Sequence, residues 1–220
     1  MPLRVLAANE ADAPKAAAIE EAAYGPNPID GVLFPGPRPA ERETRAEGLV
    51  KLLRGNSACR WAKVVDTDLA DDEMVAFTMW YIWESPPKDS SFSSYRGPGS
   101  NPEACELLFG GLNKMRLEIM DGKPYAYLKL MHTDPKHQRR GAASLLMDWG
   151  LREADRLGIP SFLEASAEGR PLYEKFGFRE VKRLTIDLSV WGGPSELSFP
   201  LMLRPVGGHR ARVDLDETRV

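Results

Sequence analysis

A short basic segment, Gln138–Ala143 (QRRGAA), stands between an apolar stretch and a stretch with one apolar stripe. The first N–H groups of a helix have no partner inside the helix and lie at the positive end of its dipole, so a helix start can hold an anion. Gly141 lets the backbone approach a ligand closely, and the two arginines before it add positive charge. The segment has neither the GK[ST] of a P-loop nor the three glycines of a dinucleotide fingerprint. We therefore predict a pyrophosphate site, although these residues alone also fit a helix start that binds nothing.

A second motif, Leu172–Phe178 (LYEKFGF), follows farther along the chain. Together the two motifs resemble the R/Q-x-x-G-x-G/A and (L/F)YEKxGF signatures of the GNAT superfamily of N-acetyltransferases. The resemblance is strong over residues 125–178 and holds in element order over 3–205. It implies that acetyl-CoA is the cofactor and lies in a V-shaped gap where the fourth and fifth strands of the sheet splay apart. It also implies that an amine attacks the thioester directly, without an acyl-enzyme.

The resemblance assigns roles to individual residues. Tyr173 matches the tyrosine that protonates the leaving thiolate, although a packed core tyrosine would look the same in the sequence. Backbone groups on the fourth strand would bond the pantetheine arm, and N–H groups at the helix start would hold the pyrophosphate. Ser166 stands where the family often has asparagine, so its contact with the pantetheine would have a shorter reach. The predicted cofactor-binding residues are Met131, Thr133, Gln138, Arg139, Arg140, Gly141, Ala142, Ala143, Ser144 and Ser166.

An alkyl amine must lose a proton before it can attack. With a pKa near that of lysine, about 10.4, it is almost wholly protonated at pH 7, and supplying the neutral form costs about 4–5 kcal/mol. Glu164 precedes Ser166 by two residues and should face the same side of its strand, so it is the predicted base, or else a buried structural acceptor. His132, at the end of the fourth strand, could relay a proton or serve only as a structural residue. An arylamine would need no base. No metal is expected, because His132 and His137 lack the further ligands of a zinc site.

The acceptor is predicted to be a small-molecule amine. In the family, the loop after the first helix and the loop between the last two strands usually shape the acceptor site, and here the first of these is the Pro- and Gly-rich segment 25–39. The Pro-rich loop and an insertion at 84–122 favour an enclosed site. A protein N-terminal or lysine acetyltransferase and a non-catalytic acyl-CoA-binding regulatory module are the alternatives. An aromatic wall suited to an apolar or aromatic amine is predicted from Phe34, Trp80, Trp83 and Trp191, each of which also fits an ordinary core position.

The elements that must position these residues alternate along the chain. Strands are expected at 3–7, 60–66, 74–83, 125–131, 161–165, 178–189 and 197–205, and helices at about 9–24, 40–54, 101–119, 142–157 and 168–176. The long crossover that contains the fourth helix makes the fourth and fifth strands parallel. With the resemblance added, the expected fold is a mixed, mostly antiparallel α/β sheet of about six to seven strands, splayed between strands 4 and 5, with helices on both faces.

Composition limits the class of protein and its partners. The chain has 220 residues, of which 43% are hydrophobic and 28% charged, and its formal charge of −3 argues against a nucleic-acid binder. We expect one domain over 1–206, which includes the irregular and helical insertion, and a polar tail over 207–220. Cys59 and Cys105 are expected to be reduced thiols, and no apolar run is long enough to span a membrane. The expected location is cytoplasmic, and the expected state is a monomer or a homodimer.

Overall fold

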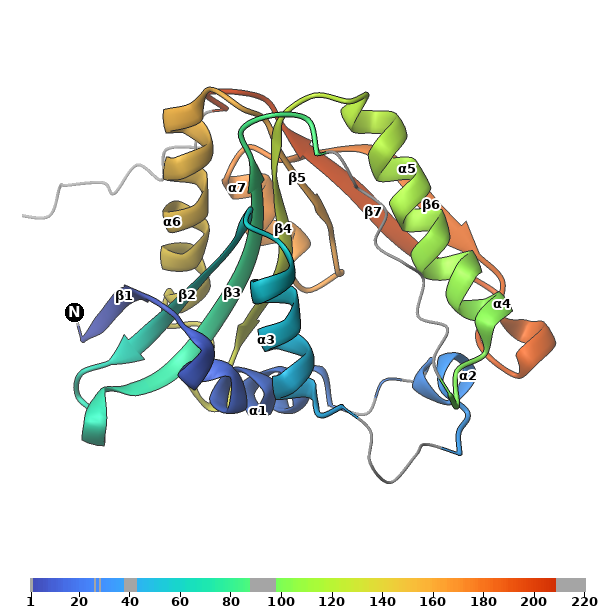
Figure 1. Ribbon diagram of the computed structural model, residues 1–220, viewed down its shortest axis with the longest axis horizontal. Coiled ribbons are helices and arrows are strands. Elements are labelled where there is room, and N and C mark those ends of the chain that lie inside the picture. Colours follow the sequence, from blue (N-terminus) through green and yellow to red (C-terminus); the bar gives the residue numbers. More distant parts are fainter. Residues whose placement is uncertain (1, 26, 28, 38–42, 88–97, 209–220) are drawn as a thin grey trace, which may run out of the picture.

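The fold is built around one sheet of seven strands (Figure 1). The computed structural model describes residues 2–25, 27, 29–37, 43–87 and 98–208. The strands are β1 (Leu3–Ala7), β2 (Cys59–Asp66), β3 (Glu73–Trp83), β4 (Tyr125–Thr133), β5 (Ser161–Glu164), β6 (Arg179–Ile186) and β7 (Leu197–Arg204). They lie in the order β1-β2-β3-β4-β5-β7-β6. Every neighbouring pair is antiparallel except β4 and β5, which are parallel. The predicted fold class is confirmed.

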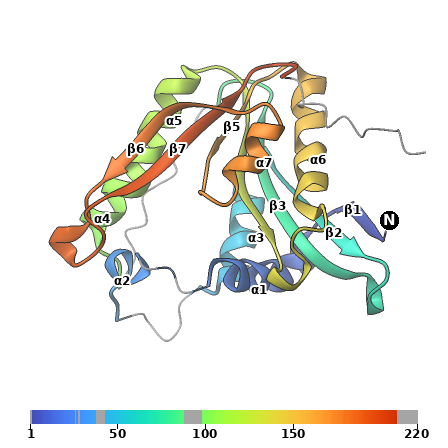
Figure 2. The ribbon, with the colours of Figure 1, turned by 180° about the vertical axis from the view of Figure 1, so that it is seen from behind.

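Helices cover both faces of the sheet, as Figures 1 and 2 show. On one face lie α1 (Ala13–Tyr24), α3 (Arg45–Gly55) and the helical insertion, which comprises α4 (Pro102–Cys105), a π-helical segment (Glu106–Gly110) and α5 (Gly111–Met120). On the other face lie α6 (Ala142–Leu157) and α7 (Arg170–Lys175). The short α2 (Asp30–Leu33) lies beside α4, where the Leu33 carbonyl accepts a hydrogen bond from the Asn101 amide.

Capping residues decide where the helices begin and end. The Thr44 hydroxyl oxygen accepts a hydrogen bond from the Glu47 amide, and the Glu47 carboxylate accepts one from the Thr44 amide, so α3 begins at Arg45. The predicted start of this helix at residue 40 was wrong for the described residues 43 and 44, and residues 40–42 lie outside the description. α6 ends, as predicted, where Gly158 adopts a left-handed conformation with φ of 65°.

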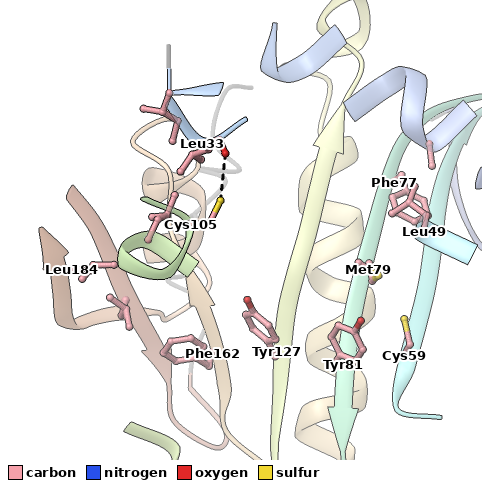
Figure 3. Packing of buried hydrophobic residues seen from close by; sticks show 14 of the residues in the cluster. Leu33, Leu49, Cys59, Phe77, Met79, Tyr81, Cys105, Tyr127, Phe162 and Leu184 are labelled. Atoms are coloured by element: carbon pink, nitrogen blue, oxygen red, sulfur yellow. Dashed lines mark hydrogen bonds between the residues drawn. The ribbon is translucent and has the colours of Figure 1, made fainter. Parts of the chain in front are cut away.

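Apolar cores lie on both faces of the sheet. Figure 3 shows part of the core between the sheet and α1, α3 and the insertion, in which Tyr127 of β4 stands between Phe162 of β5 and Tyr81 of β3. The ring centroids of Tyr127 and Phe162 are 6.0 Å apart. The core on the opposite face packs α6 and α7 against alternate residues of the same strands. Strands β3, β4, β5 and β7 therefore serve both faces, and a residue's parity decides which one it joins.

β4 and β5 part soon after they meet. Among the described residues they pair only through Ala126 with Ser161 and Tyr127 with Phe162. Beyond that point β5 stays with β7, while β4 continues to Thr133 beside β3. The sheet thus opens into a V between its fourth and fifth strands, as predicted.

Arg204 fastens the closed end of this V. It lies opposite Ser161 in the register of β7 and β5 and is 5% exposed. Its guanidinium donates to both carboxylate oxygens of Asp155 on α6, at 2.6 and 2.9 Å, and to the Phe176 carbonyl oxygen at 3.0 Å. One buried side chain therefore joins β7 to α6 and to the end of α7.

Other expectations concern the chain as a whole. No helix among the described residues is long and apolar enough to cross a membrane. Cys59 and Cys105 are both buried and free, and burial raises the pKa of the Cys59 thiol to about 11. The division into one domain over 1–206 and a tail over 207–220 stays a prediction, because residues 209–220 lie outside the description.

Replacing Arg204 with methionine should lower the free energy of unfolding by about 2–3 kcal/mol, because two carbonyl oxygens and a partly buried carboxylate lose their donor. The measurement is denaturant unfolding followed by circular dichroism. Arg156→Met is the matched control, since its bidentate partner Glu153 is on the surface and the pair contributes about 0–1 kcal/mol. Equal losses in the two variants would contradict the role assigned to Arg204.

Candidate active site

The start of α6 presents unpartnered backbone amides to open space. Gly141 precedes the helix with φ of 94°, and no side chain caps this end within the described chain. Helical hydrogen bonding begins with the Leu145 amide, which donates to the Gly141 carbonyl oxygen at 3.1 Å. A Cβ built on Gly141 would meet nothing within 4 Å, and Arg139 is also left-handed, with φ of 62°. Turns of this kind aim successive N–H groups into one concavity, and the helix dipole favours an anion there.

The predicted positive charge beside this concavity is smaller than expected. Arg140 lies 2.6 Å from the Asp66 carboxylate and 2.9 Å from His137 Nδ1, so its side chain ties the loop to the end of β2. Arg139 is exposed. Gln138 turns back to donate to the Thr133 carbonyl oxygen at 3.4 Å. A buried carboxylate therefore already balances the charge of Arg140, and the predicted contact of Arg140 with the cofactor stays a prediction.

The edge of β4 that faces the gap carries the other predicted cofactor positions. Met131 and Thr133 pair with Thr78 and Ala76 of β3, and within the described part of the chain they have no partner on β5. This edge leads directly into the loop that precedes α6. A strand edge of this kind offers amide and carbonyl groups to an extended ligand. One extended ligand could therefore contact both residues 138–144 and these two strand positions. The predicted contacts stay predictions.

Tyr173 lies on the α6 side of the gap. Its side chain belongs to the core beneath α6 and is edge-on to Phe178, with ring centroids 6.2 Å apart. A Cβ on Gly169 would lie 2.9 Å from the Tyr173 hydroxyl, so the glycine leaves room for this orientation. Burial raises the pKa of Tyr173 to about 12, and the electrostatic effect of Tyr24 adds to the rise. The hydroxyl therefore keeps its proton at neutral pH and can donate it.

Ser166 supports the same turn. Its Oγ accepts a hydrogen bond from the Gly169 amide at 3.1 Å, just before α7. A serine hydroxyl that accepts one hydrogen bond can still donate another. The predicted donation to the pantetheine thus stays compatible with the structure, beside a structural role that the sequence did not reveal.

Glu164 lies in a polar cluster on the opposite face. Its Oε2 accepts a hydrogen bond from the Tyr127 hydroxyl at 2.7 Å, and its Oε1 is 3.8 Å from Arg116 Nη1. The Arg116 guanidinium lies 4.5 Å from the centroid of the Tyr127 ring and is 2% exposed. Sequence reasoning missed Tyr127 and Arg116. A signal existed for Arg116, which follows the stripe residue Leu112 by one helical turn and so lies among core positions.

His132 occupies the far end of β4 on this same face. It is 5% exposed, lies edge-on to Tyr24 at 4.9 Å between ring centroids, and has Nε2 4.0 Å from Glu20 Oε1. Glu20 is itself held by Arg45 through two hydrogen bonds of 2.7 Å. Desolvation lowers the pKa of His132, with Glu20 opposing the shift, so the imidazole is neutral at pH 7. The contribution of α1 to this environment was not foreseen from the sequence.

The predicted aromatic wall does not form as one unit. Phe34, Trp83 and Trp191 belong to the core on the α1 and α3 face, whereas Trp80 belongs to the core beneath α6. Trp80 is fully buried, and a Cβ on Gly150 of α6 would lie 2.3 Å from its ring. The assignment of Trp80 to the wall was wrong, because an odd separation on one strand places it opposite Trp83.

Other features lie away from the gap. Among the described residues, no group of three His, Cys, Asp or Glu side chains is placed to hold a metal ion. A surface hollow on the helical insertion contains none of the predicted site residues. It is lined by Pro102, Glu103, Glu106, Leu107 and Gly111.

Comparison with known sequences finds a family that part of the chain matches. Residues 117–192 match the family described as Acetyltransferase (GNAT) domain. A curated sequence named "Probable acyltransferase SID5", from Ajellomyces capsulatus, is 37% identical over 68 residues, which are 30% of this chain and 50% of that protein. The chain thus matches about half the length of this curated relative.

Solved structures share the fold. The chain resembles histone acetyltransferase HPA2 and related acetyltransferase from Corynebacterium glutamicum with a TM-score of 0.61 and 19% identity, covering 94% of this chain and 97% of that one. It resembles a phosphinothricin acetyltransferase from Sinorhizobium meliloti in complex with AcCoA with a TM-score of 0.56 and 14% identity, covering 96% and 92%. Arabidopsis thaliana NAA60 in complex with acetyl-CoA gives 0.55 and 14%, covering 91% and 97%. These structures confirm the predicted fold, and the match of residues 117–192 to the acetyltransferase domain agrees with the predicted superfamily.

Gly141→Leu should weaken acetyl-CoA binding by at least about tenfold, or about 1.4 kcal/mol, because the side chain would project into the concavity. Gly158→Leu at the other end of α6 is the matched control. Both positions have positive φ and open space, so both variants carry about 1–2 kcal/mol of backbone strain. Calorimetric titration of both variants with acetyl-CoA separates the loss of affinity caused by the side chain in the concavity from any loss caused by backbone strain. Unchanged affinity in folded Gly141→Leu would contradict the anion site at the helix start.

Proposed function

We propose that the chain is an acetyltransferase of the GNAT superfamily and that it transfers an acetyl group from acetyl-CoA to the primary amine of a small molecule. The observation that carries the proposal is the parting of β4 and β5 beside the uncapped start of α6. This arrangement provides an amide-lined edge next to an anion site. A ligand with an amide-containing arm and a pyrophosphate suits both parts.

The residues of the chain divide the binding between them. The N–H groups of residues 139–144 would hold the pyrophosphate, and backbone groups of Met131 and Thr133 would bond the pantetheine arm, with Ser166 adding a hydroxyl donor. Acetyl-CoA supplies an activated thioester that the amine attacks directly in a ternary complex. Binding of this kind fixes the reacting carbon relative to the acceptor, which is a large part of such catalysis.

Tyr173 is the proposed general acid. A thiolate leaves when the amine displaces it, and a neutral phenol within reach can protonate the sulfur. Its burial and its raised pKa, about 12, support this role, because the proton is retained until the reaction needs it. Glu164 and His132 lie on the opposite face of the sheet, the side on which the acceptor is proposed to bind.

A small, partly apolar acceptor is supported by the surroundings of that face. Trp83 stacks on Tyr81 with ring centroids 5.3 Å apart, and Phe34 and Trp191 pack against the same core. The α4–α5 insertion packs over β6 beside this core. A protein acceptor would need an open groove instead, and a regulatory acyl-CoA-binding module would need no acid at Tyr173.

Acetyl-CoA should bind with one site per chain in calorimetric titration, and more tightly than dephospho-CoA. Release of free CoA on addition of a panel of alkyl- and arylamines should then identify acceptors. Binding without turnover across small amines and peptides would favour the regulatory module, and turnover of peptides alone would favour a protein acceptor. Absence of binding would contradict the proposal itself.

Tyr173→Phe should lower kcat by about 10²–10⁴-fold, because the leaving thiolate loses its proton donor. The affinity for acetyl-CoA should stay within about twofold, since the ring and its packing are retained. Steady-state kinetics and calorimetry on the same preparation test both parts. An unchanged kcat would remove the general-acid role from Tyr173.

A further inference from the structure

Lys129 stands where β4 leaves the regular sheet. On β3, the partners of Leu128 and Leu130 are consecutive residues, so Lys129 between them is the extra residue of a β-bulge. It also follows Tyr127, the last residue of β4 that pairs with β5. A bulge interrupts the ladder and re-aims a side chain. This one places a lysine at the root of the gap proposed for the thioester.

The lysine joins the polar cluster described around Glu164. Its Nζ is 3.5 Å from the Tyr127 hydroxyl oxygen and 5.7 Å from the centroid of that ring. The Tyr127 hydroxyl donates to one oxygen of Glu164, and Arg116 faces the other. Tyr127 and Arg116 are buried, whereas Lys129 is partly exposed. Lys129 is therefore the partly accessible amine of this cluster, beside the partly exposed carboxylate of Glu164.

The electrostatic environment favours the neutral form of this amine. Desolvation has the largest effect, and it lowers the pKa of Lys129. The charges of Arg116 and Arg45 lower this pKa further, whereas the carboxylates of Glu164 and Glu20 raise it. The net direction is down. A lysine with a lowered pKa is neutral in a larger fraction of molecules near pH 7, and only the neutral form accepts a proton.

Glu164 and His132 are less suited than Lys129 to accept a proton at this place. Both oxygens of Glu164 are turned toward positive or donating groups, Arg116 and Tyr127. His132 lies farther along β4 and faces Glu20 and Tyr24 of α1. Neither side chain lies at the bulge.

We propose that Lys129 accepts the proton of the attacking amine, and that Tyr127 and Glu164 position it. The inference rests on the proposed acetyl transfer. The substrate ammonium gives one proton to neutral Lys129 Nζ, and its nitrogen then bonds to the thioester carbonyl carbon as the C–S bond breaks. Tyr173 protonates the sulfur, the second N–H proton restores the Tyr173 hydroxyl, and Lys129 releases its proton to solvent.

Two substitutions separate a proton acceptor from a positive charge. Lys129→Met removes both functions, whereas Lys129→Arg keeps the charge on a group that does not give up its proton. With benzylamine as acceptor, both variants should lose about 10²–10⁴-fold in kcat. With aniline, which is already neutral at pH 7, both should stay within a few-fold of the unsubstituted protein. Lys123→Met, at an exposed lysine outside the site, is the control and should retain full activity.

Three results of these kinetics would overturn the proposal. Full benzylamine activity in Lys129→Arg would assign the residue a charge role only. Equal losses with both amines would assign it a structural role. The third concerns the pH profile. In the unsubstituted protein, kcat for benzylamine should rise with pH as Lys129 loses its proton. If the same rise persisted in Lys129→Met, a group other than Lys129 would be the proton acceptor.

A measurement without turnover keeps this inference distinct from the proposed function. Competitive labelling of the resting protein with acetic anhydride at a series of pH values, read by mass spectrometry, reports the titration of each lysine. Lys129 should become reactive at lower pH than an ordinary lysine, whose pKa is about 10.4. Labelling at or above that pH would overturn the inference while leaving the acetyltransferase proposal intact. Failure of acetyl-CoA to bind would instead remove the proposed function, whatever the titration of Lys129.

Discussion

The short pairing of β4 with β5 is the constraint on which the remaining geometry depends. A strand that leaves its neighbour exposes a row of backbone donors and acceptors that need partners. In this chain the row begins after Tyr127 and ends at the loop before α6. The same parting leaves Tyr173 on one side of the gap and Glu164 on the other. Arg204 is important because it holds the closed end, so the gap opens in one direction only.

Charge at the cofactor end comes mainly from the backbone. The chain is acidic, with a formal charge of −3, and one of the two arginines in the loop is already balanced by Asp66. What remains is the uncapped start of a 16-residue helix and the left-handed turn at Arg139 and Gly141. Fixed amide dipoles hold an anion without the conformational entropy that long side chains lose on binding.

Local features of the site were predictable from the sequence, and contacts between distant segments were not. The loop and helix at Gln138–Ala143 and the turn into Tyr173 depend on glycine and on apolar spacing, which can be read directly. The position of Trp80 depends on strand parity along β3. The bulge at Lys129 shifts the parity of β4 without any mark in the sequence. The pairing of Arg140 with Asp66 joins segments that only the folded sheet brings together.

Arg116 gives the helical insertion a part in the chemistry of the sheet. It comes from α5, a segment that could be mistaken for a peripheral addition, yet it balances a carboxylate on β5. Removing one partner of a buried ion pair costs about 3–5 kcal/mol. The insertion and the fifth strand are therefore linked, and each restricts the substitutions that the other tolerates. Grafting this face of the sheet onto a scaffold without the insertion would require a new neutral residue at position 164.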